Sequence, residues 1–337
     1  MPNDRAAVLG AGSWGTALAV HLANAGQHVT LWGRDPSLVE ALRQDRANRA
    51  YLPGIALSDR IAPTGDLARA VSGARFVVVA VPSHGLRAVV HEATPHLAAG
   101  VILVSATKGL ENDTLMRMSE VLSTETAGRS PVVVLSGPSF ASEVAQGAPT
   151  ALVAASTEAE AVRAVQDEFR ASYFRLYGSD DVVGVEVGGA LKNVIAIAAG
   201  VVEGLGLGHN ALAALVTRGL AEVSRLACAM GGHRDTMAGL SGLGDLVLTC
   251  TGSLSRNHHV GIELGRGRSL EAIVGSMRMV AEGIRTTTAA LALGERYGVE
   301  LPIAAQMADV LAGQRTPREA LECLMLRPQK IETERIG

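Results

Sequence analysis

The chain has 337 residues and a net charge of −3, with 48% apolar and 19% charged residues. Such a chain folds into about two domains, and its weak net charge excludes binding of a polyanion such as DNA by overall charge. Its three cysteines lie far apart in sequence, which fits neither a disulfide framework nor paired metal ligands and indicates a reducing compartment. The N-terminus lacks an apolar signal segment, and no apolar stretch approaches the ~20 residues that span a bilayer. We therefore expect a soluble, cytoplasmic protein.

Short apolar runs, mostly rich in β-branched residues, alternate with helical patterns in the first half of the chain. Continuous apolar strands separated by helices are typical of a parallel sheet that is covered on both faces. The expected strands are Ala6–Leu9, Val29–Trp32, Phe76–Val81, Val101–Val104, Val132–Leu135 and Ala151–Ala155. The expected helices include Thr16–Ala25, Leu38–Asp45 and Ala159–Arg170.

After about Asp180 the strand pattern ends, and the sequence is helical to the C-terminus. The expected fold class is α/β, with a doubly wound parallel-sheet domain over residues 1–180 and a second, all-α domain over residues 181–337. The chain has no tandem repeat, basic tail or flexible linker between the halves. We therefore expect the two domains to pack closely and to leave a cleft, where ligand sites commonly lie.

A glycine-rich turn, GAGSWG at residues 10–15, follows the first expected strand and opens a helix. In a dinucleotide fingerprint the first glycine, here Gly10, permits the turn. The second, Gly12, lets the backbone reach the pyrophosphate, and the third, Gly15, lets the helix pack against the strand. An ordinary glycine turn is the alternative, but the position between strand and helix favours a Rossmann-type cofactor site. Its N–H groups and helix dipole would stabilise the phosphate charges.

The residue that follows the second expected strand bears on the choice of cofactor. NAD-preferring enzymes place an acidic residue about 20 positions after the glycines, where it binds the ribose 2′-OH. This chain has Arg34 there, next to Gly33, and an arginine pairs with a 2′-phosphate. The alternative is a solvated loop charge, with Asp35 capping the next helix. We expect NADP to be preferred, and use of NAD as well stays open.

Two further loops follow expected strands in the same way. Lys108 follows Val101–Val104, and Ser139 follows Val132–Leu135. Both residues therefore lie at the carboxyl ends of parallel strands, where open α/β sheets bind ligands. Ser139 is also expected to cap the next helix. The alternatives are a surface lysine and a structural loop.

Lys192 lies in a helical segment where its neighbours on the same face are Gly188, Ala196 and Gly200. A face of such small residues is not a solvated face, which suggests that a ligand approaches the lysine closely. The accompanying desolvation would lower the lysine pKa towards a value useful for proton transfer. The alternative is a lysine at the domain interface that extends its charge to water.

Polar residues gather again between residues 242 and 257. Asp245 and Thr249 are four residues apart and share one face if their segment is helical. A group of donors without an acid then follows, which suits a dianionic phosphate. These donors are Ser255, Arg256 and Asn257. The structural alternatives are a helix cap for Asp245 and a loop for the donors.

A series of motifs occurs in one order along nearly the whole chain, from Gly10 to about Glu282. The motifs are GAGSWGTA (10–17), KGL (108–110), SGPSFA (136–141), LKN (191–193), GLGD (242–245) and SRN (255–257). In combination they closely resemble the bacterial-type NAD(P)-dependent glycerol-3-phosphate dehydrogenases. The combination is far more specific than any one motif.

The resemblance implies a cytoplasmic oxidoreductase, commonly a homodimer, that reversibly reduces dihydroxyacetone phosphate to sn-glycerol 3-phosphate for phospholipid synthesis. It implies that Lys192 donates the proton to the carbonyl oxygen during reduction and accepts it during oxidation. The implied substrate positions are Lys108, Gly137, Ser139, Lys192, Asn193, Asp245, Thr249, Ser255, Arg256 and Asn257. Besides the glycines of the turn, the implied cofactor positions are Ser13, Trp14, Arg34, Tyr51, Lys108, Ala141, Arg256, Val280 and Glu282.

Two other functions stay open from the sequence. One is a related reductase of a 3-hydroxy acid or a sugar phosphate, although a carboxylate substrate would not require the donors at 255–257. The other is a catalytically silent dinucleotide sensor, which would not require Lys192 or Asp245. No metal centre is expected. His258 and His259 are adjacent, and adjacent histidines rarely share a face; no matching ligand spacing accompanies them either.

Overall fold

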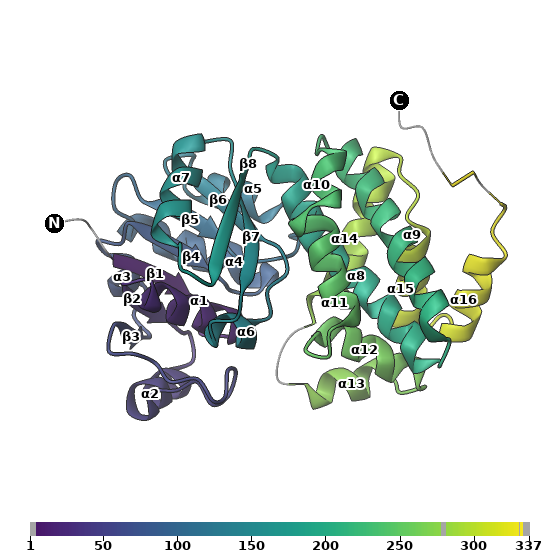
Figure 1. Cartoon of the computed structure of the whole chain (residues 1–337), viewed down its shortest axis with the longest axis horizontal. Coiled ribbons are helices and arrows are strands. Elements are labelled where there is room, and N and C mark those ends of the chain that lie inside the picture. The colour runs from purple at the N-terminus through teal and green to yellow at the C-terminus, as the bar shows by residue number, and fades with distance from the viewer. Residues whose placement is uncertain (1–4, 278–280, 330, 333–337) are drawn as a thin grey trace.

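The computed structural model describes residues 5–277, 281–329 and 331–332, with a sheet half beside a helical half (Figure 1). The strands are β1 (Arg5–Leu9), β2 (His28–Trp32), β3 (Ile61–Thr64), β4 (Phe76–Val79), β5 (Ile102–Ser105), β6 (Val132–Ser136), β7 (Thr150–Ala155) and β8 (Phe174–Ser179). Between them lie α1 (Ser13–Asn24), α2 (Pro36–Asp45), α3 (Leu67–Val71), α4 (Ser83–Ala93), the 3-10 turn η1 (Thr94–His96), α5 (Met118–Glu125), α6 (Ala141–Ala145) and α7 (Ala159–Glu168). The helical half contains α8 (Val182–Gly204), α9 (Gly208–Ala229), α10 (Arg234–Ala238), the π-helical turn η2 (Leu240–Gly244), α11 (Asp245–Thr251), α12 (Arg256–Gly265), α13 (Leu270–Ser276), α14 (Glu282–Tyr297), α15 (Pro302–Leu311) and α16 (Pro317–Met325).

The strands form one sheet in the order β3-β2-β1-β4-β5-β6-β7-β8. The order reverses between β1 and β4, which is the place where doubly wound sheets bind ligands beyond the carboxyl ends of their strands. Alternate residues of β1 enter two different cores. Ala6 and Val8 pack with α1 and α7 on one face, whereas Ala7 and Leu9 pack with α3, α4 and α5 on the other. The predicted α/β class, a doubly wound sheet followed by helices, is confirmed.

One strand pair differs from the predicted parallel sheet. β7 runs antiparallel to β6, with Val134 opposite Ala155, and β8 then runs parallel to β7. A strand that is buried on both faces reads as a continuous apolar run in either direction. The sequence pattern therefore identified β7 as a strand but did not carry its direction.

Two strands, β3 and β8, were missing from the prediction. They lie at the two edges of the sheet, so each pairs along one side only. β3 has four residues and contains Pro63, which an edge strand tolerates because one row of its backbone groups is unpaired. β8 contains Gly178 and has mostly exposed residues between its buried ones. Neither segment has the continuous apolar pattern of the central strands.

The crossing of α8 and α12 is the contact of the helical half that matters most for the site. A Cβ at Gly261 would lie 1.9 Å from the main-chain oxygen of Ile197, and one at Gly200 would lie 2.0 Å from that of His258. Only glycine permits two backbones to approach so closely. Contrary to the expectation from the sequence, α8 is long and apolar enough to cross a membrane, but 89% of its apolar window is buried inside the protein. It is therefore the core helix of this half.

Replacing Gly261 with alanine is expected to lower the free energy of unfolding by about 3 kcal/mol, because the added methyl group forces the two helices apart. Gly275→Ala is the matched control. It makes the same change in α13, where an added Cβ meets no described atom within 4 Å, so the helix propensity of alanine should add up to ~1 kcal/mol. Urea denaturation followed by circular dichroism compares the two variants. Equal midpoints would show that the crossing does not require glycine at position 261.

Candidate active site

The glycine turn lies between β1 and α1, at the point where the strand order reverses. Gly10 has a φ of +115°, and a Cβ there would lie 2.7 Å from the main-chain oxygen of Ala80. A Cβ at Gly15 would lie 1.9 Å from the main-chain oxygen of Gly10. At Gly12, the N-cap of α1, an added Cβ meets no atom of the described chain within 4 Å, so space remains beside the helix N-terminus. This tight turn and open helix end fit the pyrophosphate of a dinucleotide.

Other expected cofactor residues gather around the start of α1. Trp14 and Ala141 pack against one small apolar cluster. The main-chain N–H of Tyr51 donates to Asn48 Oδ1 (3.1 Å), and Asn48 Nδ2 donates to the main-chain oxygen of Ala11 (2.9 Å). Asn48 therefore braces the glycine turn from a distant loop. The sequence analysis missed this residue, because a lone loop asparagine carries no pattern.

Arg34 follows β2 and is exposed. The next residue, Asp35, caps α2 by accepting a hydrogen bond from the main-chain N–H of Ser37 (2.9 Å), as its position after the strand indicated. The preceding residue, Gly33, packs on the glycine turn, since a Cβ there would lie 3.1 Å from that of Ala11. Arg34 thus lies next to the residues that fit the cofactor.

Lys108 and Lys192 share one carboxylate, that of Asp245. Lys192 Nζ donates to Asp245 Oδ1 and to Thr249 Oγ1 (2.9 Å). Lys108 Nζ donates to Asp245 Oδ2 (2.6 Å) and to the main-chain oxygen of Gly137 (3.0 Å). The carboxylate is almost completely buried, with 1% of the side chain exposed. Three distant segments, the loop after β5, α8 and α11, therefore meet at one point.

Burial lowers the pKa of Lys192 from its ordinary value to about 7. Desolvation is the largest cause, and the nearby charge of Lys108 acts in the same direction, while the Asp245 carboxylate opposes both. An amine with this pKa can donate a proton at neutral pH and accept one back. The expected desolvation is thus present, but the small neighbours Gly188 and Gly200 contact the protein's own backbone rather than a ligand, since a Cβ at each would lie 2.8 Å and 2.0 Å from a main-chain oxygen.

Asn257 connects three helices beside Lys192. Its Nδ2 donates to Asn193 Oδ1 on α8 (2.9 Å), and its Oδ1 accepts from the main-chain N–H of Gly283 on α14 (3.0 Å). All three residues are buried. The side-chain amide therefore holds the first turns of α12 and α14 against the middle of α8.

The other donors of this group begin α12. Ser255 caps the helix by accepting a hydrogen bond from the main-chain N–H of His258 (3.2 Å). Arg256 is exposed, yet enough protein surrounds its guanidinium to lower the pKa by desolvation, and Glu282 opposes this shift. Arg256 thus presents a positive charge at the start of α12, the helix that Asn257 ties to the neighbour of Lys192.

The prediction that Ser139 caps the next helix is wrong. The N-cap of α6 is Phe140, and Ser139 Oγ donates instead to the main-chain oxygen of Gly137 (3.0 Å). Gly137 has a φ of +134°, and its carbonyl accepts hydrogen bonds from both Ser139 and Lys108. The turn uses the hydroxyl within itself, so it orders the loop that holds Lys108.

Glu282, the first residue of α14, joins the two halves. Its carboxylate accepts hydrogen bonds from Ser83 Oγ (2.7 Å) and from the main-chain N–H of Ser83 (3.2 Å), at the start of α4. Ser83 was missing from the sequence analysis, which contained no signal for a serine at a helix start. The expected cofactor residue Val280 lies outside the described residues.

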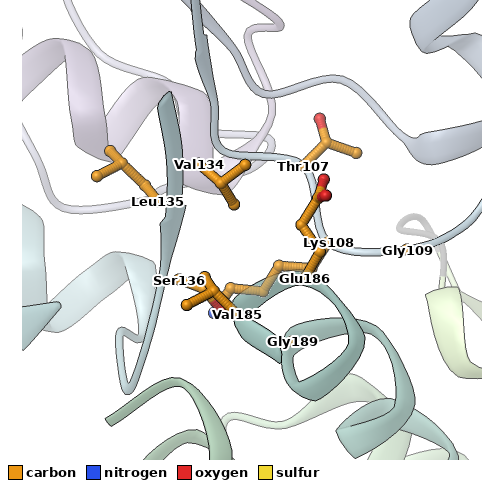
Figure 2. A pocket seen from close by; sticks show the side chains of 9 residues that line it. All are labelled: Thr107, Lys108, Gly109, Val134, Leu135, Ser136, Val185, Glu186 and Gly189. Carbon is orange, nitrogen blue, oxygen red and sulfur yellow. The ribbon is translucent and has the colours of Figure 1, made fainter. Parts of the chain in front are cut away.

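A small cavity lies next to Lys108, where α8 passes the carboxyl ends of β5 and β6 (Figure 2). Its volume of about 10 Å³ is the space that one water molecule needs. Ser136 Oγ, in the lining, is buried and makes no hydrogen bond within the described structure. The lining residues are Thr107, Lys108, Gly109, Val134, Leu135, Ser136, Val185, Glu186 and Gly189.

Comparison with known proteins places this chain in a family. The chain matches the family models for the N-terminus and the C-terminus of NAD-dependent glycerol-3-phosphate dehydrogenase, over residues 5–162 and 181–322. A glycerol-3-phosphate dehydrogenase [NAD(P)+] from Syntrophotalea carbinolica is 54% identical over 97% of this chain and 99% of its own length. The protein of the same name from Koribacter versatilis is 52% identical, covering 98% and 99%.

Solved structures agree with the sequence relatives. A crystal structure of glycerol-3-phosphate dehydrogenase from Coxiella burnetii has a TM-score of 0.93 and 38% identity, and covers 96% of this chain and 99% of its own. A ketopantoate reductase from Ralstonia eutropha shares the fold alone, with a TM-score of 0.61, 16% identity, and coverage of 94% of this chain and 99% of its own. The chain therefore belongs to the family of NAD-dependent glycerol-3-phosphate dehydrogenases.

Proposed function

We propose that this protein is an NAD(P)-dependent sn-glycerol-3-phosphate dehydrogenase that reversibly reduces dihydroxyacetone phosphate and so supplies a precursor of phospholipids. The observation that carries the proposal is the buried Lys192, held by Asp245 and Thr249, with a pKa of about 7. The relatives that share at least half of their residues with this chain have the corresponding name.

The nicotinamide cofactor supplies the hydride that reduces the carbonyl carbon. Negative charge then grows on the carbonyl oxygen, and the ammonium of Lys192 neutralises this charge and donates its proton. Asp245 and Thr249 hold Nζ so that its remaining N–H points at one place. In the oxidation direction the neutral amine accepts the proton from the hydroxyl.

The phosphate of the substrate makes no bond changes, so the residues that bind it act through orientation. Arg256 supplies the charge, and remote binding energy of this kind lowers the barrier only if the reacting end is held in place at the same time. Arg256 begins the helix that Asn257 ties to Asn193, the neighbour of Lys192. The residues assigned to substrate are Lys108, Gly137, Ser139, Lys192, Asn193, Asp245, Thr249, Ser255, Arg256 and Asn257.

The two parts of the chain divide the work. Residues 1–180 supply most of the cofactor contacts, among them Gly10, Gly12 and Gly15, and residues 181–337 bind most of the substrate. The resemblance to the family supports a cytoplasmic homodimer, which light scattering after size-exclusion chromatography tests. The remaining residues assigned to cofactor are Ser13, Trp14, Arg34, Tyr51, Lys108, Ala141, Arg256, Val280 and Glu282.

The primary test is loss of reduced-nicotinamide absorbance with dihydroxyacetone phosphate, in parallel with NADPH and NADH and with dihydroxyacetone as the control. Fast oxidation that requires the phosphate supports the proposal. If the protein binds a cofactor but oxidises neither NADPH nor NADH with this substrate, it is a related reductase with another substrate or a silent sensor.

Cofactor choice is tested at Arg34. Replacing Arg34 with alanine is expected to raise the KM for NADPH by about 10-fold and to leave the KM for NADH unchanged, because a charge-assisted hydrogen bond contributes ~1.5 kcal/mol or more. NADH is the internal control for the folded state of the variant. Parallel rises in both KM values would contradict recognition of a 2′-phosphate by this residue.

A further inference from the structure

Glu186 is a buried carboxylate in the helical half whose hydrogen-bond and ion-pair partners, within the described part of the chain, lie in the sheet half. It accepts hydrogen bonds from the main-chain N–H of Ser119 (2.8 Å), from Ser119 Oγ (2.5 Å) and from Arg117 Nη1 (2.7 Å). Only 4% of its side chain is exposed. Ser119 and Arg117 lie at the start of α5, so a carboxylate on α8 occupies the N-terminus of a helix in the other half. This contact joins the halves without belonging to the proposed substrate site.

Burial raises the pKa of Glu186, and the hydrogen bonds and charge of Ser119 and Arg117 oppose that shift. Both oxygens of the carboxylate are used, one by the main-chain N–H and the other by the hydroxyl and the guanidinium. Because the carboxylate accepts hydrogen bonds from several fixed donors, it permits little sliding of one half on the other. Two packed domains otherwise move relative to each other by default.

The same helix surface passes directly over Lys108. Glu186 and Lys108 line one cavity together with Gly189 and Ser136 (Figure 2). A Cβ at Gly189 would lie 2.7 Å from Ser136 Oγ and 3.8 Å from Lys108 Cγ, so α8 has no spare room against this part of the sheet half. Any shift of α8 on α5 is therefore transmitted to the Lys108 side chain.

Lys108 and Lys192 approach Asp245 from different halves of the protein. Lys108 belongs to the loop that leads to α5, whereas Lys192 lies on α8, the helix that carries Glu186. Their Nζ atoms bind opposite oxygens of the single carboxylate of Asp245. Asp245 belongs to α11 of the helical half, so its contact with Lys108 crosses between the halves and persists only if they keep their relative position.

We propose that Glu186 is a positioning residue, which fixes α8 on the start of α5 and thereby sets the spacing of Lys108 and Lys192 across Asp245. The inference rests on the proposed function, because the spacing matters to a reaction in which Lys192 transfers a proton. Misplacement of a catalytic group by ~1 Å costs up to about 100-fold in rate, so a contact outside the substrate site can control turnover.

Glu186→Ala tests the proposal through the pH dependence of dihydroxyacetone phosphate reduction. Among the described residues, the charges that act on Lys192 are those of Lys108 and Asp245, and Lys192 in turn acts on the thiol of Cys250. Reduction uses the protonated amine, so the rate falls as pH rises through the pKa of Lys192. Loss of the contacts of Glu186 with Ser119 and Arg117 loosens the packing between the halves and admits water. The water reduces the desolvation of Lys192 and raises its pKa. The fall in rate at high pH is the alkaline limb of the pH profile, called the pH limb below. We expect this limb to move up by about one pH unit and kcat/KM for the substrate to fall about 10-fold.

The binding of NADPH, measured by fluorescence, is the readout that separates positioning from misfolding. The glycine turn and most of the residues assigned to the cofactor lie within the sheet half, so the Kd of Glu186→Ala for NADPH is expected to stay within about twofold of the wild-type value. Glu186→Gln keeps an oxygen that accepts from the main-chain N–H of Ser119, so its limb should lie between those of the wild type and the alanine variant.

Glu120→Gln is the matched control. Glu120 also binds Arg117 (2.8 Å) and also caps the start of α5, but it belongs to the sheet half itself. Its replacement alters the same arginine and the same helix end without breaking the link to α8. The pH limb and kcat/KM are therefore expected to remain those of the wild type. A shift of the pH limb as large as that in Glu186→Ala would overturn the proposal, since any damage to the start of α5 would then produce the same effect.

Ser119→Ala supplies a second, milder variant, which removes one hydrogen bond to Glu186 and retains the main-chain donor. It is expected to shift the limb in the same direction by less than Glu186→Ala, and it carries the test if that variant does not fold. An unmoved limb in both Ser119→Ala and Glu186→Gln, or a lower rate at every pH with the limb in place, would overturn the proposal. Absence of turnover in the wild-type protein would instead refute the proposed function.

Discussion

Replacing Lys192 with alanine is expected to lower kcat for the reduction of dihydroxyacetone phosphate by about 10⁴-fold. The variant loses both the positive charge beside the developing oxyanion and the proton donor, and each contributes roughly 10²-fold or more. Cofactor binding should stay nearly intact, because the glycine turn and α1 belong to the other half of the protein. The measurement is loss of NADPH absorbance under saturating substrate, with the Kd for NADPH taken from fluorescence.

Lys192→Arg is the control that separates charge from proton transfer. Arginine stays protonated at every accessible pH, so it can stabilise charge but cannot deliver its proton. We expect this variant to regain at most a small part of the lost rate and to show no pH limb near 7. Normal turnover in either variant would contradict the role of Lys192, and a limb near 7 that persists would assign that limb to another group.

Replacing Arg256 with alanine is expected to lower kcat/KM for dihydroxyacetone phosphate by about 100-fold, because the phosphate loses a paired charge and its bidentate donors. At saturating NADPH, the slow reaction of unphosphorylated dihydroxyacetone should not change, since that substrate makes no phosphate contact. The ratio of the two kcat/KM values, measured in one assay, is the selectivity for phosphate. This ratio is expected to fall by the same factor.

Arg266→Ala supplies the matched control at the other end of the same helix. Arg266 is the C-cap residue of α12, where it pairs with Glu263 (3.0 Å), and its side chain is 63% exposed. Removing Arg266 changes the charge of α12 by as much as removing Arg256 does. Arg266, however, lies at the opposite end of the helix from Arg256. Phosphate selectivity should remain that of the wild type. Selectivity that survives in Arg256→Ala as well would place the phosphate elsewhere.

Local spacing carried the correct predictions. The interval between Gly10 and Gly15 predicted a tight turn that opens a helix, and the φ of Gly10 and the contact of Gly15 agree with it. The four-residue interval between Asp245 and Thr249 predicted one helix face, and both side chains bind Lys192. Such features are set by helix and turn geometry, which depends on neighbours in the sequence.

Features that depend on a distant partner were not predictable in this way. Ser139 had the residue type and position of a cap. Its hydroxyl instead donates a hydrogen bond to the main-chain oxygen of Gly137, a residue with positive φ. The direction of β7 depends on which strand lies beside it, and its apolar run is the same in both directions.

The sequence by itself determined the doubly wound class, the helical second half and the glycine turn, because periodicity and residue type decide these over short stretches. Only the tertiary structure brought Lys108 and Lys192 to Asp245, across 137 and 53 residues of chain, and Glu186 to Ser119 across 67. These contacts arise where the close crossing of glycine-bearing helices and the packing of two halves bring separate segments together. The desolvation that lowers the pKa of Lys192 is a property of that assembled environment, so it exists only in the folded protein.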